Sequence, residues 1–190
     1  ETPGPENSIG KLVAGSTMQE IAAFALDLLR ELSGERGNVF FSPWSVETAL
    51  GMSLTGTGSG TSAQRGIAGA MRLTVDPSKV GSSFASLSES MKPGDNVQKK
   101  YTPIFTQANR LWHTPTSDLK ATYRDGLFAN FGAKSIAMPF EDKDAVARSV
   151  NGWVKDETRG MIPVLISASD VPTDGFILCN AIYFKGHWVT

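Results

Sequence analysis

Apolar positions in the first third of the chain recur at helical spacing. Between Ser16 and Ser33 they fall every three or four residues and form one stripe: Ile21, Phe24, Ala25, Leu28, Leu29 and Leu32. Ser16 and Gln19 have the spacing of a capping box, and Ser33-Gly34 is typical of a helix end. Residues 1–10 are rich in proline and glycine, so we expect them to be mobile and the helix to begin near Ser16.

Turn and cap residues divide the stretch up to residue 96. Gly37-Asn38-Val39-Phe40-Phe41 predicts a short buried strand. Serine before proline, and threonine after a glycine-rich loop, are typical helix starts. Three helices are therefore predicted, from Ser42-Pro43 to about Leu54, from Thr61 to about Met71, and between Pro77 and Met91.

The second half alternates strands with helices. Strands are predicted from Tyr101 to Trp112, from Ala133 to Phe140, and over residues 176–186. Helices are predicted from Ser117-Asp118 to about Phe131, and from Asp142 or Asp144 through Thr158. The predicted order, with helices first and then strands interleaved with helices, indicates an α+β protein.

The segment from Phe176 to Trp188 (FILCNAIYFKGHW) is an apolar strand with one amide, Asn180, in its middle. A buried amide needs hydrogen-bond partners. Strand alternation puts two sets on opposite faces. We expect a core-facing set, Leu178, Asn180, Ile182 and Phe184, and a set on the other face, Cys179, Ala181 and Tyr183.

Composition is that of an ordinary globular protein. The 190 residues are 41% hydrophobic and 19% charged, with a net charge of -1. This balance gives no reason to expect nucleic acid or an acidic membrane surface as a partner. The chain opens with Glu1 rather than Met, which is compatible with processing and with a removed signal peptide.

Metal and nucleotide sites are not expected. A structural zinc site needs three or four converging ligands, and the chain has only His113, His187 and Cys179, which are scattered. Gly56-Thr57-Gly58-Ser59-Gly60 lacks the Lys-Ser/Thr of a phosphate loop and follows a predicted helix rather than a strand. We interpret it as a connection between helices and expect no cofactor.

Catalytic chemistry is not expected either. Five carboxylates flank one predicted helix: Glu141, Asp142, Asp144, Asp156 and Glu157. The first-turn acids suit the helix dipole, and the later ones alternate with Lys155 and Arg159 as on a solvated face. No serine has a nucleophile-elbow context. The chain is therefore not expected to be an enzyme, and an enzyme of another fold is the least supported alternative.

Three phrases resemble the serpin family. Asn38-Val39-Phe40-Phe41-Ser42-Pro43-Trp44-Ser45 is similar to the opening of serpin helix B. Asn151-Gly152-Trp153-Val154, followed by Thr158, Gly160 and Ile162, resembles helix F. Asn180-Ala181-Ile182-Tyr183-Phe184-Lys185-Gly186-x-Trp188 resembles the third strand of sheet A. Together they cover essentially the whole chain; Met161 and Ser59 are small departures.

The resemblance implies a serpin-like fold, in which N-terminal helices precede strands of the large mixed sheet A and a covering helix. It implies one domain over residues 1–190, incomplete without a C-terminal half that carries the reactive loop and its bait residue. It also implies site residues: a shutter of Ser42, Ser45 and Asn180; a breach at Lys185 and Trp188; and strand and covering-helix residues Phe184, Gly186, Asn151, Trp153, Thr158 and Gly160.

The function implied is inhibition of a serine protease, or of a cysteine protease, by cleavage and insertion of the reactive loop. A non-inhibitory serpin, acting as a hormone carrier or a chaperone, is the alternative. The C-terminal half, as a second chain, is an expected partner, and residues 1–190 by themselves are not expected to form a stable monomer. Secretion is expected, with a cytoplasmic location left open. Residues 77–93 contain only Lys79 and Lys92 as cations, so no strong heparin site is expected there.

Overall fold

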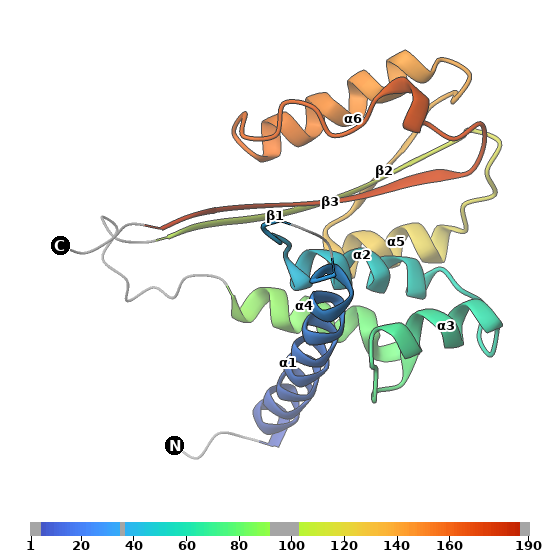
Figure 1. The fold of residues 1–190 in the computed structure, drawn as a ribbon. Coiled ribbons are helices and arrows are strands. Elements are labelled where there is room, and N and C mark those ends of the chain that lie inside the picture. Colours follow the sequence, from blue (N-terminus) through green and yellow to red (C-terminus); the bar gives the residue numbers. More distant parts are fainter. Residues whose placement is uncertain (1–4, 35–36, 92–102, 187–190) are drawn as a thin grey trace. The chain divides into compact units, whose positions relative to one another are not determined.

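The computed structural model describes residues 5–34, 37–91 and 103–186, with side chains from residue 18 onward. The chain forms two compact units, Glu1–Ser90 and Met91–Thr190, which we call the helical unit and the sheet unit. Figure 1 labels the helices and strands of each unit.

The helical unit contains four α-helices and one short 3-10 helix within its described part: α1 (Pro5–Leu32), α2 (Pro43–Thr55), α3 (Ser62–Ala70), η1 (Pro77–Lys79) and α4 (Val80–Ser90). Side-chain caps explain several of the starts. Ser42 accepts from the Ser45 backbone N–H at 3.2 Å, and Thr61 accepts from that of Gln64 at 3.1 Å. The helix boundaries predicted from serine-proline and from Thr61 are thereby confirmed.

Packing between α2 and α4 forms the core of this unit. Trp44 and Phe84 stack with ring centroids 5.0 Å apart and an interplanar angle of 17°. Phe84 is buried, and other buried apolar side chains of the unit include Ile21, Phe24, Met52, Leu54, Met71, Val80 and Leu87.

Two sequence expectations for the helical unit are wrong. The first helix begins at Pro5 rather than near Ser16, because proline fits a first helical turn and no residue up to Ser16 forces an end. Residues 37–41 form no strand, and Phe40 is 99% exposed. A strand requires a neighbouring ladder, and this segment pairs with no other described strand.

The sheet unit is an α+β arrangement. Its described elements are β1 (Ile104–His113), α5 (Ala121–Phe131), β2 (Lys134–Ala137), α6 (Lys143–Glu157), η2 (Ala168–Asp170) and β3 (Phe176–Lys185). The strand order is β2-β1-β3, with β1 parallel to β2 and antiparallel to β3. The sheet is therefore mixed, as predicted, although α5 begins later and β2 is shorter than the sequence pattern indicated.

The core of the sheet unit lies between α6 and one face of the sheet (Figure 1). Trp112 of β1 and Trp153 of α6 meet edge-on, with ring centroids 5.3 Å apart and planes at 69°. Phe140, Val146, Val150, Val154 and Val171 surround them. Burying such side chains contributes roughly 1.5–3 kcal/mol each, so this contact holds α6 on the sheet.

A buried acid lies in the helical unit. Glu47 of α2 is fully buried, and neither carboxylate oxygen has a hydrogen-bond partner in the described part of the chain. Burial, and then the nearby Glu20, raise the pKa of Glu47 from 4.5 to about 8. Glu20 of α1 accepts hydrogen bonds from the backbone N–H and the hydroxyl of Thr74 through its other oxygen, while its own Oε2 is buried and unpaired.

We predict that Glu47→Gln flattens the pH dependence of stability. Because the folded-state pKa lies above the unfolded value of 4.5, the free energy of unfolding of the wild type should fall as pH rises from about 4.5 to about 8. Glutamine has nearly the same volume as glutamate but cannot ionise. The free energy of unfolding of the variant should therefore rise relative to that of the wild type as pH increases across this window. Urea unfolding at pH 5, 7 and 9 measures this. The exposed Glu31→Gln serves as control. If the free energy of unfolding had the same pH dependence in Glu47→Gln and in the wild type, the prediction would be contradicted.

Candidate functional site

Asn180 of β3 lies directly opposite Asn109 of β1 in the antiparallel register. Its side-chain Nδ2 donates to Asn109 Oδ1 at 2.6 Å, and Asn109 Nδ2 donates to the backbone carbonyl of Phe131 at 2.8 Å. Two hydrogen bonds thus run from β3 through β1 to the end of α5. The expected need of Asn180 for a partner is met by a residue that the sequence analysis did not single out. Its signal was present, since Asn109 is an amide between Ala108 and Arg110 in a strand pattern.

Ser42 and Ser45 belong to the helical unit, at the start of α2. The Ser42 hydroxyl caps that helix, as predicted, and both residues are half-buried. Asn180 belongs to the sheet unit, and its contact to Asn109 lies within that unit. The shutter formed by these three residues therefore stays a prediction.

The register confirms the predicted division of β3 into two faces. Cys179 and Ala181 belong to the core under α6, and Arg159 lies over the Tyr183 ring at 5.2 Å on that same side. The opposite face carries the asparagine pair, and Leu111 lies opposite Leu178. The set predicted to face the core is less buried than expected: Leu178, Asn180 and Ile182 are half-buried and Phe184 is 67% exposed, whereas the buried residues of β3 are Cys179 and Ala181.

The covering helix is tied to the loop that follows it by the predicted motif residues. Asn151 Oδ1 accepts from the backbone N–H groups of Leu165 and Ile166, at 2.7 and 3.0 Å, and its Nδ2 donates to the Ile166 carbonyl at 2.8 Å. The buried Thr158 donates to the Val154 carbonyl and accepts from the Ile162 N–H. These bonds hold the backbone of residues 162–166 against α6 and its C-cap residue.

Gly160 has a structural reason to be glycine. It adopts φ +81°, in the left-handed region that side chains disfavour. Its N–H donates to the Lys155 carbonyl at 2.7 Å, which closes the end of α6. The Thr-x-Gly spacing is therefore explained by the reversal of the chain after the helix.

β3 is an edge strand in the described sheet. Its ten residues pair with β1 on one side, and no described strand pairs with its other side. Phe176, Phe184 and Lys185 are exposed along it. Gly186 follows the strand, with a Phe184 ring carbon 3.4 Å from where a Cβ would lie. Trp188, the other predicted breach residue, lies outside the described residues, as does His187.

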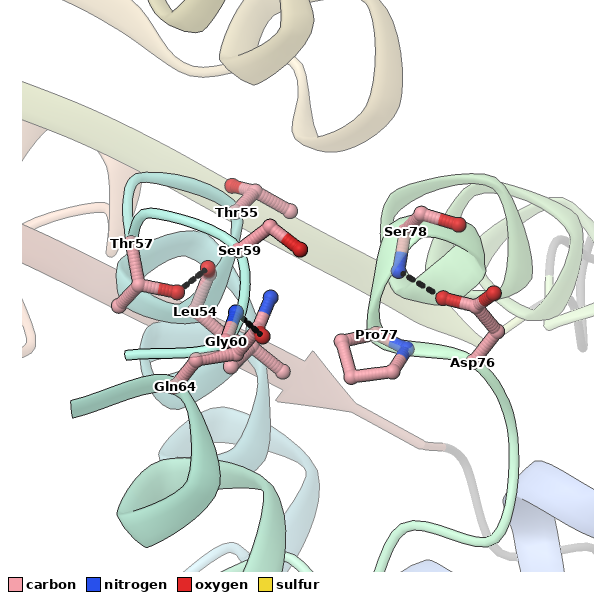
Figure 2. Close-up of a pocket in the computed structure, with 9 residues that line it drawn as sticks. All are labelled: Leu54, Thr55, Thr57, Ser59, Gly60, Gln64, Asp76, Pro77 and Ser78. Carbon is pink, nitrogen blue, oxygen red and sulfur yellow. Dashed lines mark hydrogen bonds between the residues drawn. The ribbon is translucent and has the colours of Figure 1, made fainter. Parts of the chain in front are cut away.

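The glycine-rich loop lines a pocket of about 630 Å³ between the end of α2 and η1 (Figure 2). Its polar groups are engaged locally. The Thr57 hydroxyl donates to the Leu54 carbonyl at 2.7 Å, and the Gly60 N–H donates to the Gln64 side chain at 2.8 Å. Asp76 accepts from the Ser78 N–H, a bond that lowers the Asp76 pKa, so an anion faces this pocket. The loop follows α2 and leads into α3, so it connects two helices, as interpreted from the sequence.

A model of the family described as Serpin (serine protease inhibitor) matches residues 19–190. The chain belongs to the serpin family. It is 36% identical over 180 residues to the leukocyte elastase inhibitor of Sus scrofa, covering 90% of this chain and 45% of that relative. It is 33% identical over 182 residues to serpin B6 of Bos taurus, covering 88% of this chain and 44% of the relative.

A solved structure of cleaved Serpin 42Da has the same fold as this serpin chain, with a TM-score of 0.81 at 23% identity. The alignment covers 93% of this chain and 45% of that structure. The chain thus spans less than half the length of the serpins it matches, and its fold is an incomplete serpin fold. The secretion expected from the sequence is not supported by these relatives.

The described residues of this serpin include neither a membrane-spanning helix nor a cluster of metal-binding side chains. No described helix is long and apolar enough to cross a membrane. No group of three or more histidine, cysteine or acidic side chains in the described part of the chain lies together as metal ligands would. Lys79 is exposed at η1 and Lys92 lies outside the described residues, so the heparin expectation stays a prediction.

We predict that Asn180→Ala lowers the free energy of unfolding by about 1–3 kcal/mol, because it leaves the Asn109 amide oxygen without its partner. A double-mutant cycle with Asn109→Ala isolates the pair, and a coupling energy clearly above zero is expected. Urea unfolding provides the measurement, with the exposed Asn38→Ala as matched control. Additive effects of the two alanines would show that the pair is not a stabilising contact.

Cys179 should react slowly with thiol reagents in the native protein. It is 7% exposed, and burial raises the pKa of its thiol to about 11, so little reactive thiolate is present at pH 8. Because it is the single cysteine of the chain, labelling in urea gives the reference rate. Native labelling as fast as in urea would contradict the assignment of Cys179 as a core residue.

Proposed function

We propose that the whole protein inhibits serine endopeptidases by inserting its cleaved reactive loop beside β3. The observation that carries this proposal is the position of β3, which is a ten-residue edge strand with one ladder unpaired among the described strands. Similarity to leukocyte elastase inhibitors supports a protease as the target class. The reactive loop would come from the other half of the protein, on the same polypeptide or on a second chain.

The chemistry takes place on the protease and the loop. The catalytic serine of the protease attacks the scissile carbonyl of the loop, the peptide bond breaks, and the departing amine takes the proton. The carbonyl carbon remains bound to the serine as an acyl ester. Insertion of the loop then carries the attached protease away before water can hydrolyse the ester. In this scheme the present chain is the framework that accepts the strand and performs no bond-breaking step itself.

The driving force comes from pairing a strand edge. Every second residue of β3 directs its N–H and C=O away from β1, toward the open edge. Each new hydrogen bond contributes about 0.5–1.5 kcal/mol net, and an added strand also covers Phe176 and Phe184. The sum is enough to favour insertion over an exposed loop.

Three groups of residues are proposed to control insertion. Ser42, Ser45 and Asn180 would form the shutter, with Asn109 as the contact of Asn180 across the β1–β3 ladder. Lys185 and Trp188 would mark the breach at which insertion begins. The covering helix, with Asn151, Trp153, Thr158 and Gly160, would hold the opposite face while the edge opens.

Mixing the full-length protein with leukocyte elastase is expected to give a 1:1 covalent complex that survives SDS, because the acyl ester is trapped. An elastase in which the catalytic serine is replaced by alanine should give none. Cleavage of the protein without a covalent complex would contradict inhibition and favour the non-inhibitory alternative, in which the loop hinge resists insertion.

A further inference from the structure

A second pocket, of about 220 Å³, opens where β1, the end of α5, the start of β2 and the end of α6 meet. Two cations line it, Arg110 of β1 and Lys134 of β2, and they lie opposite each other in the parallel register. Gln107 and Asn109 of β1 also line it, although the Asn109 amide is already bonded to Asn180 and to the Phe131 carbonyl, and Glu157 is the acidic side chain in the lining. The pocket lies within the sheet unit.

Arg110 is incompletely satisfied in this position. Its guanidinium carbon lies 5.3 Å from the ring centroid of Trp153 and 5.9 Å from that of Trp112, on the α6 side of the sheet. Its Nε is buried and has no hydrogen-bond partner, and the guanidinium forms no ion pair with any described residue. Aromatic rings stabilise the charge of a guanidinium but accept few of its five N–H donors. Burying such a donor without an acceptor is unfavourable, so a ligand that supplies a hydrogen-bond acceptor would be stabilised at this site.

Glu157 does not supply that acceptor. Its Oε1 accepts from the indole N–H of Trp153 at 3.1 Å, and it forms no ion pair with Arg110 or Lys134 among the described contacts. Lys134 is exposed and likewise lacks an ion pair in the described part of the chain. Two cations and one oriented carboxylate leave the pocket with net positive charge, which favours an anionic ligand.

We propose that this pocket binds a small oxyanion, a phosphate, sulfate or carboxylate group, held by the Arg110 guanidinium with Lys134 as the second cation. A guanidinium presents parallel N–H donors that match two oxygens of such a group. The volume lies below the roughly 300–1,000 Å³ of pockets for drug-sized ligands, so it suits a single oxyanion with bridging waters. Occupancy would join β1, β2 and the ends of α5 and α6.

The test is thermal unfolding of the full-length protein in sodium phosphate and in sodium acetate, each compared with sodium chloride at equal ionic strength, with ³¹P NMR titration for the phosphate Kd. Phosphate or acetate should raise the midpoint relative to chloride, since a ligand that binds only the folded state stabilises it. Arg110→Met should weaken binding by about tenfold or more, because a bidentate charged pair is lost. The exposed Arg148→Met, on α6 outside the pocket, should leave the Kd unchanged.

A second variant keeps the test decisive if Arg110→Met does not fold. Lys134→Met removes an exposed cation. It should also raise the phosphate Kd, while the midpoint of thermal unfolding in sodium chloride stays at the wild-type value. Glu157→Gln should lower the Kd, because it removes the negative charge of the lining. Equal midpoints in all three salts for the wild type, or a Kd unaffected by both Lys134→Met and Glu157→Gln, would overturn the proposal.

Discussion

The β1–β3 ladder is the interaction on which the sheet unit depends. Ten residue pairs, from Ile104 with Lys185 to His113 with Phe176, fix the register without a break. Because side chains alternate across a strand, that register decides at once which residues meet α6 and which face the other way. It places Cys179 and Ala181 in the core, and it brings Asn109 and Asn180 together. A shift by one residue would bury the amides under α6 and expose the core.

The same ladder satisfies the backbone hydrogen-bonding groups on only one edge of β3. One edge of the strand is paired with β1, and its other edge faces no described strand. Unpaired edges recruit further strands, and proteins normally cover or shorten them. The insertion of a loop strand proposed above would use this edge. The packing of Trp153 on Trp112 holds α6 on one face of the sheet.

Local sequence signals predicted most of the fold. The errors are explained by contacts between segments that lie far apart in the sequence. The caps at Ser42, Thr61 and Asp142 placed three helix starts, because each side chain satisfies N–H groups a few residues away. Residues 37–41 have the composition of a strand, but a strand exists only with a neighbour, which composition cannot reveal. Phe184 lies on the face of β3 that strand alternation predicted, yet its position near the strand end leaves it exposed. Asn109 and Arg110 were missed because their importance appears only when β1 lies against β3, α5 and α6.

Hydrogen exchange along β3 tests the central claim, that its outer edge receives the reactive loop, most directly. The measurement compares amide exchange of residues 176–185 in the intact full-length protein and after cleavage of the loop by protease. The account predicts that every second amide of β3, those directed away from β1, becomes strongly protected on cleavage, while those bonded to β1 change little. Unchanged exchange at the outward amides, with the loop cut, would show that no strand is added there.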